Sequence, residues 1–377
     1  MRDLIARSRV LPLLTLLIGL LVLSTVIEKN MDVLSIQSAD AQSTAPTNAN
    51  PLLANWSGPY GGVPPFDRVQ IAAFKPALET AMAENLGEVE KIAKNSATPN
   101  FENTIAELER SGRTLDRVTT VYGVWAGTMA SPEFQVVQRE MAPKLAAFND
   151  QITQNEALFK RIEAVYNSPG KKKLTAEQQR LAWLYYTNFV RSGAKLGSDA
   201  KARLSQINQE LAGLFTHFSQ NVLAEENDQY VMLASDADLA GLPQSVRDAA
   251  ANAAVTKKQT GWLIQNTRSS IDPFLTYSDR RDLREKAWRM FVNRGDNGDE
   301  HDNNAIITQI LALRAERAKL LGYPTHAHWR VENSMAKTPE RAMELMQAVW
   351  KPAVARVHEE VADMQAMADK EKELMQV

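Results

Sequence analysis

Residues 198–218 read SDAKARLSQINQELAGLFTHF, and this stretch decides the class of fold. Its apolar side chains recur at intervals of mostly three and four residues: Leu204, Ile207, Leu211, Leu214, Phe215 and Phe218. This spacing places them along one side of an α-helix. Ser198 stands where a helix N-cap is expected. The pattern therefore predicts a long amphipathic helix whose apolar side packs against other helices, as in an all-α fold.

Comparable start and stop signals occur on both sides of this segment. Ser131 is followed by Pro132 at the tolerated first helical position, and Thr175 forms a capping box with Gln178. A last helix begins at Thr338-Pro339 and keeps its helical pattern to the final residue, without a stop signal. This suggests that the sequence ends inside an element.

Strands are expected in one place. The runs Tyr230 to Ala234 and Trp262 to Ile264 have strand character, and a helix beginning near Pro243 lies between them. The sequence therefore predicts a mainly helical, all-α fold with a small β insertion near residues 230–266.

The composition narrows the classes of function. Among 377 residues, 43 are Lys or Arg and 45 are Asp or Glu, which gives a formal net charge of −2. Such a balance disfavours a nucleic-acid partner. The sequence contains no cysteine, so disulfides, thiol nucleophiles and Cys-based zinc sites are excluded.

The N-terminus has the form of an export signal. A basic start containing Arg2, Arg7 and Arg9 precedes an uncharged run, residues 10–26, and a small-x-small site ends at Ala41. We expect residues 1–41 to be a signal peptide, or residues 10–26 to remain as an N-terminal membrane anchor. A polar linker (42–55) and a helical region (56–377) follow. The protein is expected to be exported, periplasmic or secreted, with the leader as its only contact with a membrane.

The segment His358-Glu359-Glu360-Val361-Ala362 comes nearest to a known catalytic motif. The H-E-x-x-H motif needs two histidines one helical turn apart, with the glutamate as general base. Ala362 occupies the position of the second histidine. We therefore expect His358 to lie on a charged helix surface and to bind no metal.

Other candidate clusters have simpler explanations. His326 and His328 would point about 200° apart on a helix and could not share a metal. The acidic run 296–302 lacks the spacing of a calcium loop, and Asp302 suits a helix cap better. His217 is expected to be a packed core histidine.

Two further features are interpreted as structural. Lys171 to Lys173 form a short loop cluster. Six tryptophans are expected in the core: Trp125, Trp183, Trp262, Trp288, Trp329 and Trp350. From the residues alone, we assign no catalytic residue and no metal ligand, and no substrate-binding residue can be named.

Several phrases in the same order resemble the N-terminal part of the thimet oligopeptidase and peptidyl-dipeptidase group of zinc metallopeptidases. The resemblance is strongest to the bacterial dipeptidyl carboxypeptidase branch. Oligopeptidase A belongs to the same family. It covers nearly everything after the leader. The phrases are GPYGGVPPFDRV (58–69), PNFENTIAELERSGRTLDRV (99–118), FVRSGAKL (189–196), HFSQNVLAEEN (217–227), DLAGLP (238–243), LREKAWRMFVNRG (283–295), DNNAIITQILALRAERAKLLGY (302–323) and MAKTPE (335–340), preceded by Asn50-Pro51.

The resemblance implies a two-lobed helical peptidase in which a C-terminal H-E-x-x-H helix and a downstream glutamate hold zinc. No position in residues 1–377 matches that motif. We therefore expect this chain to be the N-terminal helical lobe of an exported oligopeptidase, truncated before its catalytic part and inactive alone. Zinc would belong to the full-length parent and would not bind this chain. The expected partners are short peptide substrates and the missing C-terminal part.

The alternative is a non-catalytic helical module that binds peptides or serves as a scaffold. Peptide affinity without turnover would favour it.

Overall fold

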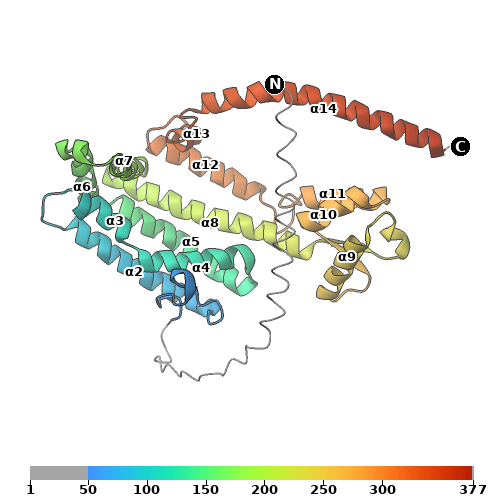
Figure 1. Cartoon of the computed structure of the whole chain (residues 1–377), viewed down its shortest axis with the longest axis horizontal. Helices are drawn as coiled ribbons and strands as arrows, with labels where there is room; N and C mark the ends of the chain where they lie inside the picture. Colours follow the sequence, from blue (N-terminus) through green and yellow to red (C-terminus); the bar gives the residue numbers. More distant parts are fainter. Residues whose placement is uncertain (1–49, 376–377) are drawn as a thin grey trace, which may run out of the picture. The chain divides into compact units, whose positions relative to one another are not determined.

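The prediction of a mainly helical chain is confirmed by the computed structural model, which describes residues 50–375. The expected leader (1–41) and most of the expected linker lie outside the described residues. The longer helices are α2 Phe74–Ala93, α4 Arg113–Thr128, α5 Pro132–Thr153, α6 Glu156–Asn167, α7 Ala176–Arg191, α8 Ser198–Asp228, α9 Gln244–Thr256, α10 Arg268–Tyr277, α11 Arg281–Val292, α12 Asn304–Leu320 and α14 Pro339–Met375 (Figure 1). The shorter elements are α3 Glu107–Arg110, α13 His326–Val331, a π-helical turn Phe101–Ala106 and 3-10 turns at Pro59–Gly61, Ile71–Ala73, Pro169–Lys173 and Asp236–Leu239.

The predicted capping chemistry is confirmed at the starts of α5 and α7 and is corrected at the start of α8. The Ser131 side chain caps α5, and Thr175 and Gln178 form the reciprocal capping box at the start of α7. Ser198, however, is the first residue of α8, and Gly197 is its N-cap. The Ser198 hydroxyl bonds to the Asp199 carboxylate at 3.3 Å and not to a backbone N–H.

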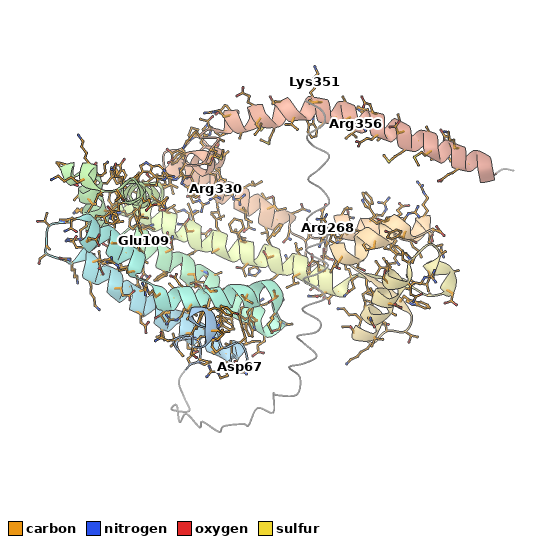
Figure 2. The ribbon with its side chains drawn as sticks, in the orientation of Figure 1. Asp67, Glu109, Arg268, Arg330, Lys351 and Arg356 are labelled. Atoms are coloured by element: carbon orange, nitrogen blue, oxygen red, sulfur yellow. The ribbon has the colours of Figure 1, made fainter. Side chains whose placement is uncertain are left out.

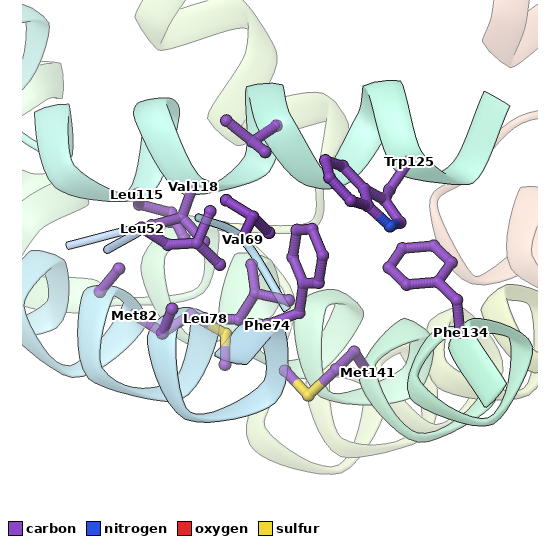
Figure 3. Packing of buried hydrophobic residues seen from close by; sticks show 13 residues of the cluster. Leu52, Val69, Phe74, Leu78, Met82, Leu115, Val118, Trp125, Phe134 and Met141 are labelled. Atoms are coloured by element: carbon purple, nitrogen blue, oxygen red, sulfur yellow. The ribbon is translucent and has the colours of Figure 1, made fainter. Parts of the chain in front are cut away.

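The first core lies between α2, α4 and α5. Phe74 is fully buried, and its ring centroid lies 5.2 Å from that of Phe134 and 5.4 Å from that of Trp125 (Figure 3). Leu52, within the expected linker, is also buried there, and the Asn50 side chain donates to the Ala73 carbonyl at 2.8 Å. Within the described residues, Asn50 and Leu52 thus belong to the first core.

The α8 helix connects this core to the rest of the described chain. It packs along α5 and also along α12 (Figure 1). The predicted stripe is buried at Leu204, Ile207 and Leu211, whereas Phe215 is 39% exposed. The buried stripe thus covers the first half of α8.

The predicted β insertion is present. Strands β1 (Tyr230–Leu233) and β2 (Trp262–Gln265) pair in antiparallel register, with Tyr230 opposite Gln265 and Leu233 opposite Trp262. Helix α9 connects the strands, and with α10 and α11 it covers their apolar side chains to form a separate small core. Within residues 50–375, no helix is both long and apolar enough to cross a membrane.

Candidate functional site

His358 lies on the exposed surface of α14, as predicted. The adjacent Glu359 and Glu360 both pair with Arg356, at 2.9 and 3.1 Å. Arg356 is labelled on α14 in Figure 2. These carboxylates are therefore engaged in surface ion pairs. Across the described residues, no group of three or more His, Asp or Glu side chains is arranged to hold a metal ion.

His326 and His328 lie on α13 and contact different groups. Thr325 caps the helix, and its hydroxyl is 2.8 Å from Nδ1 of His328. The other ring nitrogen of His328 lies 3.5 Å from the Glu340 carboxylate. The ring centroid of His326 lies 5.5 Å from that of Trp329. The two histidines therefore face different surroundings, as the helical spacing predicted.

The acidic run 296–302 is a loop whose carboxylates hold its own backbone. Asp302 accepts from the backbone N–H groups of Gly298 and Asn304, at 2.9 and 2.8 Å. The prediction that Asp302 is the cap of α12 is wrong by one position, because Asn303 is the N-cap residue. Asn303 is buried, where it accepts from Asn221 and donates to the Phe218 carbonyl.

The predicted core location is wrong for His217 and for two tryptophans. His217 is exposed because it lies six residues after Leu211, which turns it about 120° away from the buried side of α8. Trp125 is buried, but Trp288 and Trp350 are 49% and 71% exposed. Lys171 lies in a 3-10 turn, with its ammonium 3.8 Å from the ring centroid of Tyr166.

A cavity of about 280 Å³ lies where α5, α7, α8, α12 and α13 meet. Its polar lining includes Asp150, Arg191, Asn208 and Arg317. Its apolar lining includes Leu204, Leu211, Phe215, Leu321 and Trp329. A carboxylate, two guanidinium groups and an apolar wall therefore share one small cavity.

Asn208 fixes the spacing of the opposite charges in this cavity. Its amide nitrogen donates to Oδ1 of Asp150 at 2.8 Å, and its amide oxygen accepts from Nη1 of Arg317 at 3.2 Å. Asp150 is only 3% exposed, and neither its Oδ2 nor Nε of Arg317 has a hydrogen-bond partner among the described residues. Both atoms have almost no surface accessible to solvent, so neither is open to the cavity.

Arg191 and Trp329 form the other polar side of the cavity. The Arg191 guanidinium pairs with Glu332 and donates to the Trp329 carbonyl, while the Trp329 indole donates to the Arg191 carbonyl at 3.1 Å. The Arg317 guanidinium lies 4.7 Å from the Trp329 ring centroid. The charge of Arg191 is thus paired with that of Glu332. Arg317 is connected to Asp150 by hydrogen bonds through the Asn208 side chain.

Burial and crowded positive charge change the protonation behaviour of this region. Burial raises the pKa of Asp150, and hydrogen bonds from neighbouring groups, first of all Asn208, oppose that shift. Burial also lowers the pKa of Arg317, helped by Arg314 and Arg330. The pKa of His326 falls to about 4 because its ring is desolvated and lies near the same three arginines. The labelled Arg330 marks the position of α13 in Figure 2.

No pattern in the sequence predicts this cavity. Its polar residues come from α5, α7, α8 and α12, and no motif connects them.

The α14 helix carries an apolar stripe that no element within residues 50–375 covers. Its members recur at helical spacing and are 46–71% exposed: Met343, Met346, Trp350, Val357, Val361 and Met364. Apolar side chains in such a row normally face a partner element. Figure 2 shows the side chains along this helix, with Lys351 and Arg356 labelled.

Comparisons with known proteins point to one peptidase family. A sequence model of peptidase family M3 matches residues 274–377. The dipeptidyl carboxypeptidases of Salmonella typhimurium and Escherichia coli are each 34% identical, over 86% of this chain and 48% of their own length. Oligopeptidase A of Salmonella typhimurium is 28% identical over 85% of this chain and 47% of its own length. The chain spans about half the length of the curated relatives it matches.

Proposed function

The chain belongs to peptidase family M3, and on that premise we propose that it is the N-terminal helical portion of a zinc-dependent oligopeptidase or peptidyl-dipeptidase that hydrolyses short peptides. The similarity to two dipeptidyl carboxypeptidases over 86% of the chain carries the proposal. Both relatives are named dipeptidyl carboxypeptidases, and we infer from this that the full-length protein releases dipeptides from peptide C-termini.

The zinc chemistry is proposed to reside in sequence outside this chain. The described residues hold no group of three or more potential ligands, and catalytic zinc requires three protein ligands and a general base. We therefore assign no step of hydrolysis to residues 50–375. The short span relative to the relatives supports this division of labour.

For the present chain we propose a structural role in substrate admission. Its helices would form one wall of a channel that accepts short extended peptides and excludes folded proteins. The uncovered stripe on α14 would pack against the remaining part of the same polypeptide. An apolar helix face normally packs against another element, and the relatives' greater length supports one within the same polypeptide.

We also propose that the protein is exported, on the evidence of the basic and apolar leader in residues 1–41. N-terminal sequencing of the mature protein, recovered from the periplasm or medium, should start at Gln42. An intact N-terminus in a cytoplasmic fraction would refute export.

The proposed activity can be tested on the protein purified from the complete native gene. It should release a C-terminal dipeptide from an N-acetylated tetrapeptide, and it should act far more slowly on a folded protein. Removal of metal by a chelator should abolish the release, and zinc should restore it.

The same assay separates the alternatives. Turnover that survives exhaustive metal removal would contradict zinc dependence. Saturable binding of the tetrapeptide without any cleavage would favour a non-catalytic peptide-binding module. Cleavage of folded proteins at the rate of short peptides would contradict the channel.

A further inference from the structure

Helix α12 has a wider apolar side than its neighbours cover. Ile310 is buried against α8, which runs beside α12 (Figure 1), and Ile306 and Leu313 pack next to it. Ile307 and Leu311 are turned about 60° and 100° from Ile310, since a helix turns about 100° per residue. They are 41% and 58% exposed. Within residues 50–375, α8 therefore covers one edge of the apolar side of α12 and leaves the other edge in water.

The far side of α12 has a different composition. Thr308, Ala312 and Lys319 lie there, and all three are exposed. Small and polar residues suit a side that faces water, whereas a helix normally places large apolar residues where another element packs. The edge formed by Ile307 and Leu311 thus has the composition of a packing surface.

This edge continues onto α8 through an arginine and an aromatic ring. Arg314 follows Leu311 by three residues, and its guanidinium lies 5.1 Å from the ring centroid of Phe215 on α8. Phe215 is itself partly exposed. We call Phe215, Ile307, Leu311 and Arg314 the α8–α12 surface. It consists of three large apolar side chains and one positive charge.

The positive charge has no counterpart in the described part of the chain. Glu316 and Glu332, the acidic residues nearest in sequence to Arg314 and Arg330, pair with other arginines. Among residues 50–375, no carboxylate forms an ion pair with Arg314 or Arg330. Both guanidinium groups lie close enough to His326 to lower its pKa. A carboxylate brought to this place would relieve the repulsion between these like charges.

We propose that the remaining part of the same polypeptide covers the α8–α12 surface with an apolar patch that carries a carboxylate opposite Arg314. This occupant is chosen because more than half of each dipeptidyl carboxypeptidase lies outside the region that this chain matches. The inference rests on the proposed function for the existence of that part. It goes further by assigning a second docking surface, on elements other than α14, and by naming the charge that the partner brings.

Cysteine labelling tests the proposal on the protein from the complete native gene. This chain supplies no cysteine of its own. Leu311→Cys places a thiol on the surface, and Ala312→Cys places one on the far side as the matched control. A maleimide should label the Leu311→Cys protein at least about tenfold more slowly, because a covered position reacts only after local opening. Peptide mass spectrometry assigns the label to the introduced position.

A second pair keeps the test decisive where Leu311→Cys fails to fold. Ile307→Cys lies on the same surface, and Thr308→Cys lies on the far side. The same difference in labelling rate is expected between them.

A charge reversal tests the carboxylate. Arg314→Glu, added to the Leu311→Cys protein, should raise the labelling rate about tenfold, because it replaces an attraction by a repulsion. Arg281→Glu on α11 makes the same chemical change at an exposed position outside the surface and should leave the rate unchanged. Ala77→Cys in the first core reports global unfolding, and its labelling should stay slow in the Arg314→Glu protein.

Four results would overturn the proposal. Equal labelling of the Leu311→Cys and Ala312→Cys proteins would show that the surface is uncovered. Protection that is lost on dilution would assign the surface to a second copy, and protection that requires an added peptide would assign it to the substrate. An unchanged rate with Arg314→Glu would contradict the carboxylate. Labelling does not depend on hydrolysis, so failure of the proposed peptidase activity would be recognised separately, by the absence of dipeptide release.

Discussion

His326 shows how a single side chain links the packing of α13 to pH. Its pKa is lowered to about 4, first by burial and then by the charges of Arg314 and Arg317. In an unfolded chain its pKa would be close to 6.5. Between these two values the unfolded state binds more protons than the folded state, so stability falls as the pH falls.

We predict that His326→Gln makes the protein less sensitive to acid. The free energy of unfolding of the wild type should decrease from pH 7 to pH 4.5. The decrease should be about 1–2 kcal/mol smaller in the variant, a value that allows for the partial exposure of the His326 ring. Calorimetry across this pH series measures the difference. The exposed His217→Gln is the matched control and should keep the wild-type slope. Parallel curves for wild type and His326→Gln would contradict the assigned pKa.

Individual residues also show where sequence reasoning fails. Helical spacing placed His326 and His328 on different sides of a helix, and their contacts agree. Spacing does not reveal which sides of a helix other elements cover. For this reason the predicted core positions of His217 and Trp288 are wrong, and both side chains are exposed. The cavity was unpredictable because Asp150, Asn208 and Arg317 become neighbours only through packing of α5, α8 and α12.

At the scale of elements, the capping chemistry predicts the starts of α5 and α7, whereas several other helices, among them α2 and α9, begin without a side-chain cap. Side-chain oxygens at an N-cap accept from backbone N–H groups that have no partner within the helix. Such caps are present at Ser131 and Thr175. The rule fails at Ser198, where Gly197 takes the extended conformation of the cap. It also does not predict that the helix after Asn100 opens with a π-helical turn, since this depends on how the turn packs.

We predict that the two hydroxyl residues differ in their effect on stability. Thr175→Ala removes the hydroxyl that accepts from the backbone N–H of Gln178, and it should lower the free energy of unfolding by about 1 kcal/mol. Ser198→Ala removes only a contact to Asp199 and should change it by less than about 0.5 kcal/mol. Urea denaturation of the two variants measures both values. An equal loss for both would show that Ser198 also acts as a cap.

At the scale of the whole molecule, the described chain has several separate cores and an uncovered apolar face on α14. The cores around Phe74 and around the β1–β2 pair each close on their own side chains. The apolar stripe on α14 is not packed against any other described element, since Trp350 is 71% exposed and Met364 is 60% exposed. Periodicity predicted the helix itself, but the absence of a covering neighbour is visible only in the structure.

We predict that residues 42–377 produced alone bind a hydrophobic dye and self-associate. The reason is that the α14 stripe would remain in water, and contiguous apolar surface of this kind drives association. Dye fluorescence and light scattering, measured at several protein concentrations, report the two effects. Replacing Met346, Trp350 and Val357 with glutamate should reduce both, because these three residues lie on the stripe.

A second set of three glutamates gives the matched control. Gln347, Lys351 and His358 are exposed residues on the same helix outside the stripe, so their replacement adds similar negative charge without removing apolar surface. That control should keep most of the dye binding. Equal loss in both triple variants would assign the effect to charge repulsion. A monodisperse wild-type segment that binds no dye would show that the stripe needs no partner, and the proposed intramolecular contact of α14 would then lose its support.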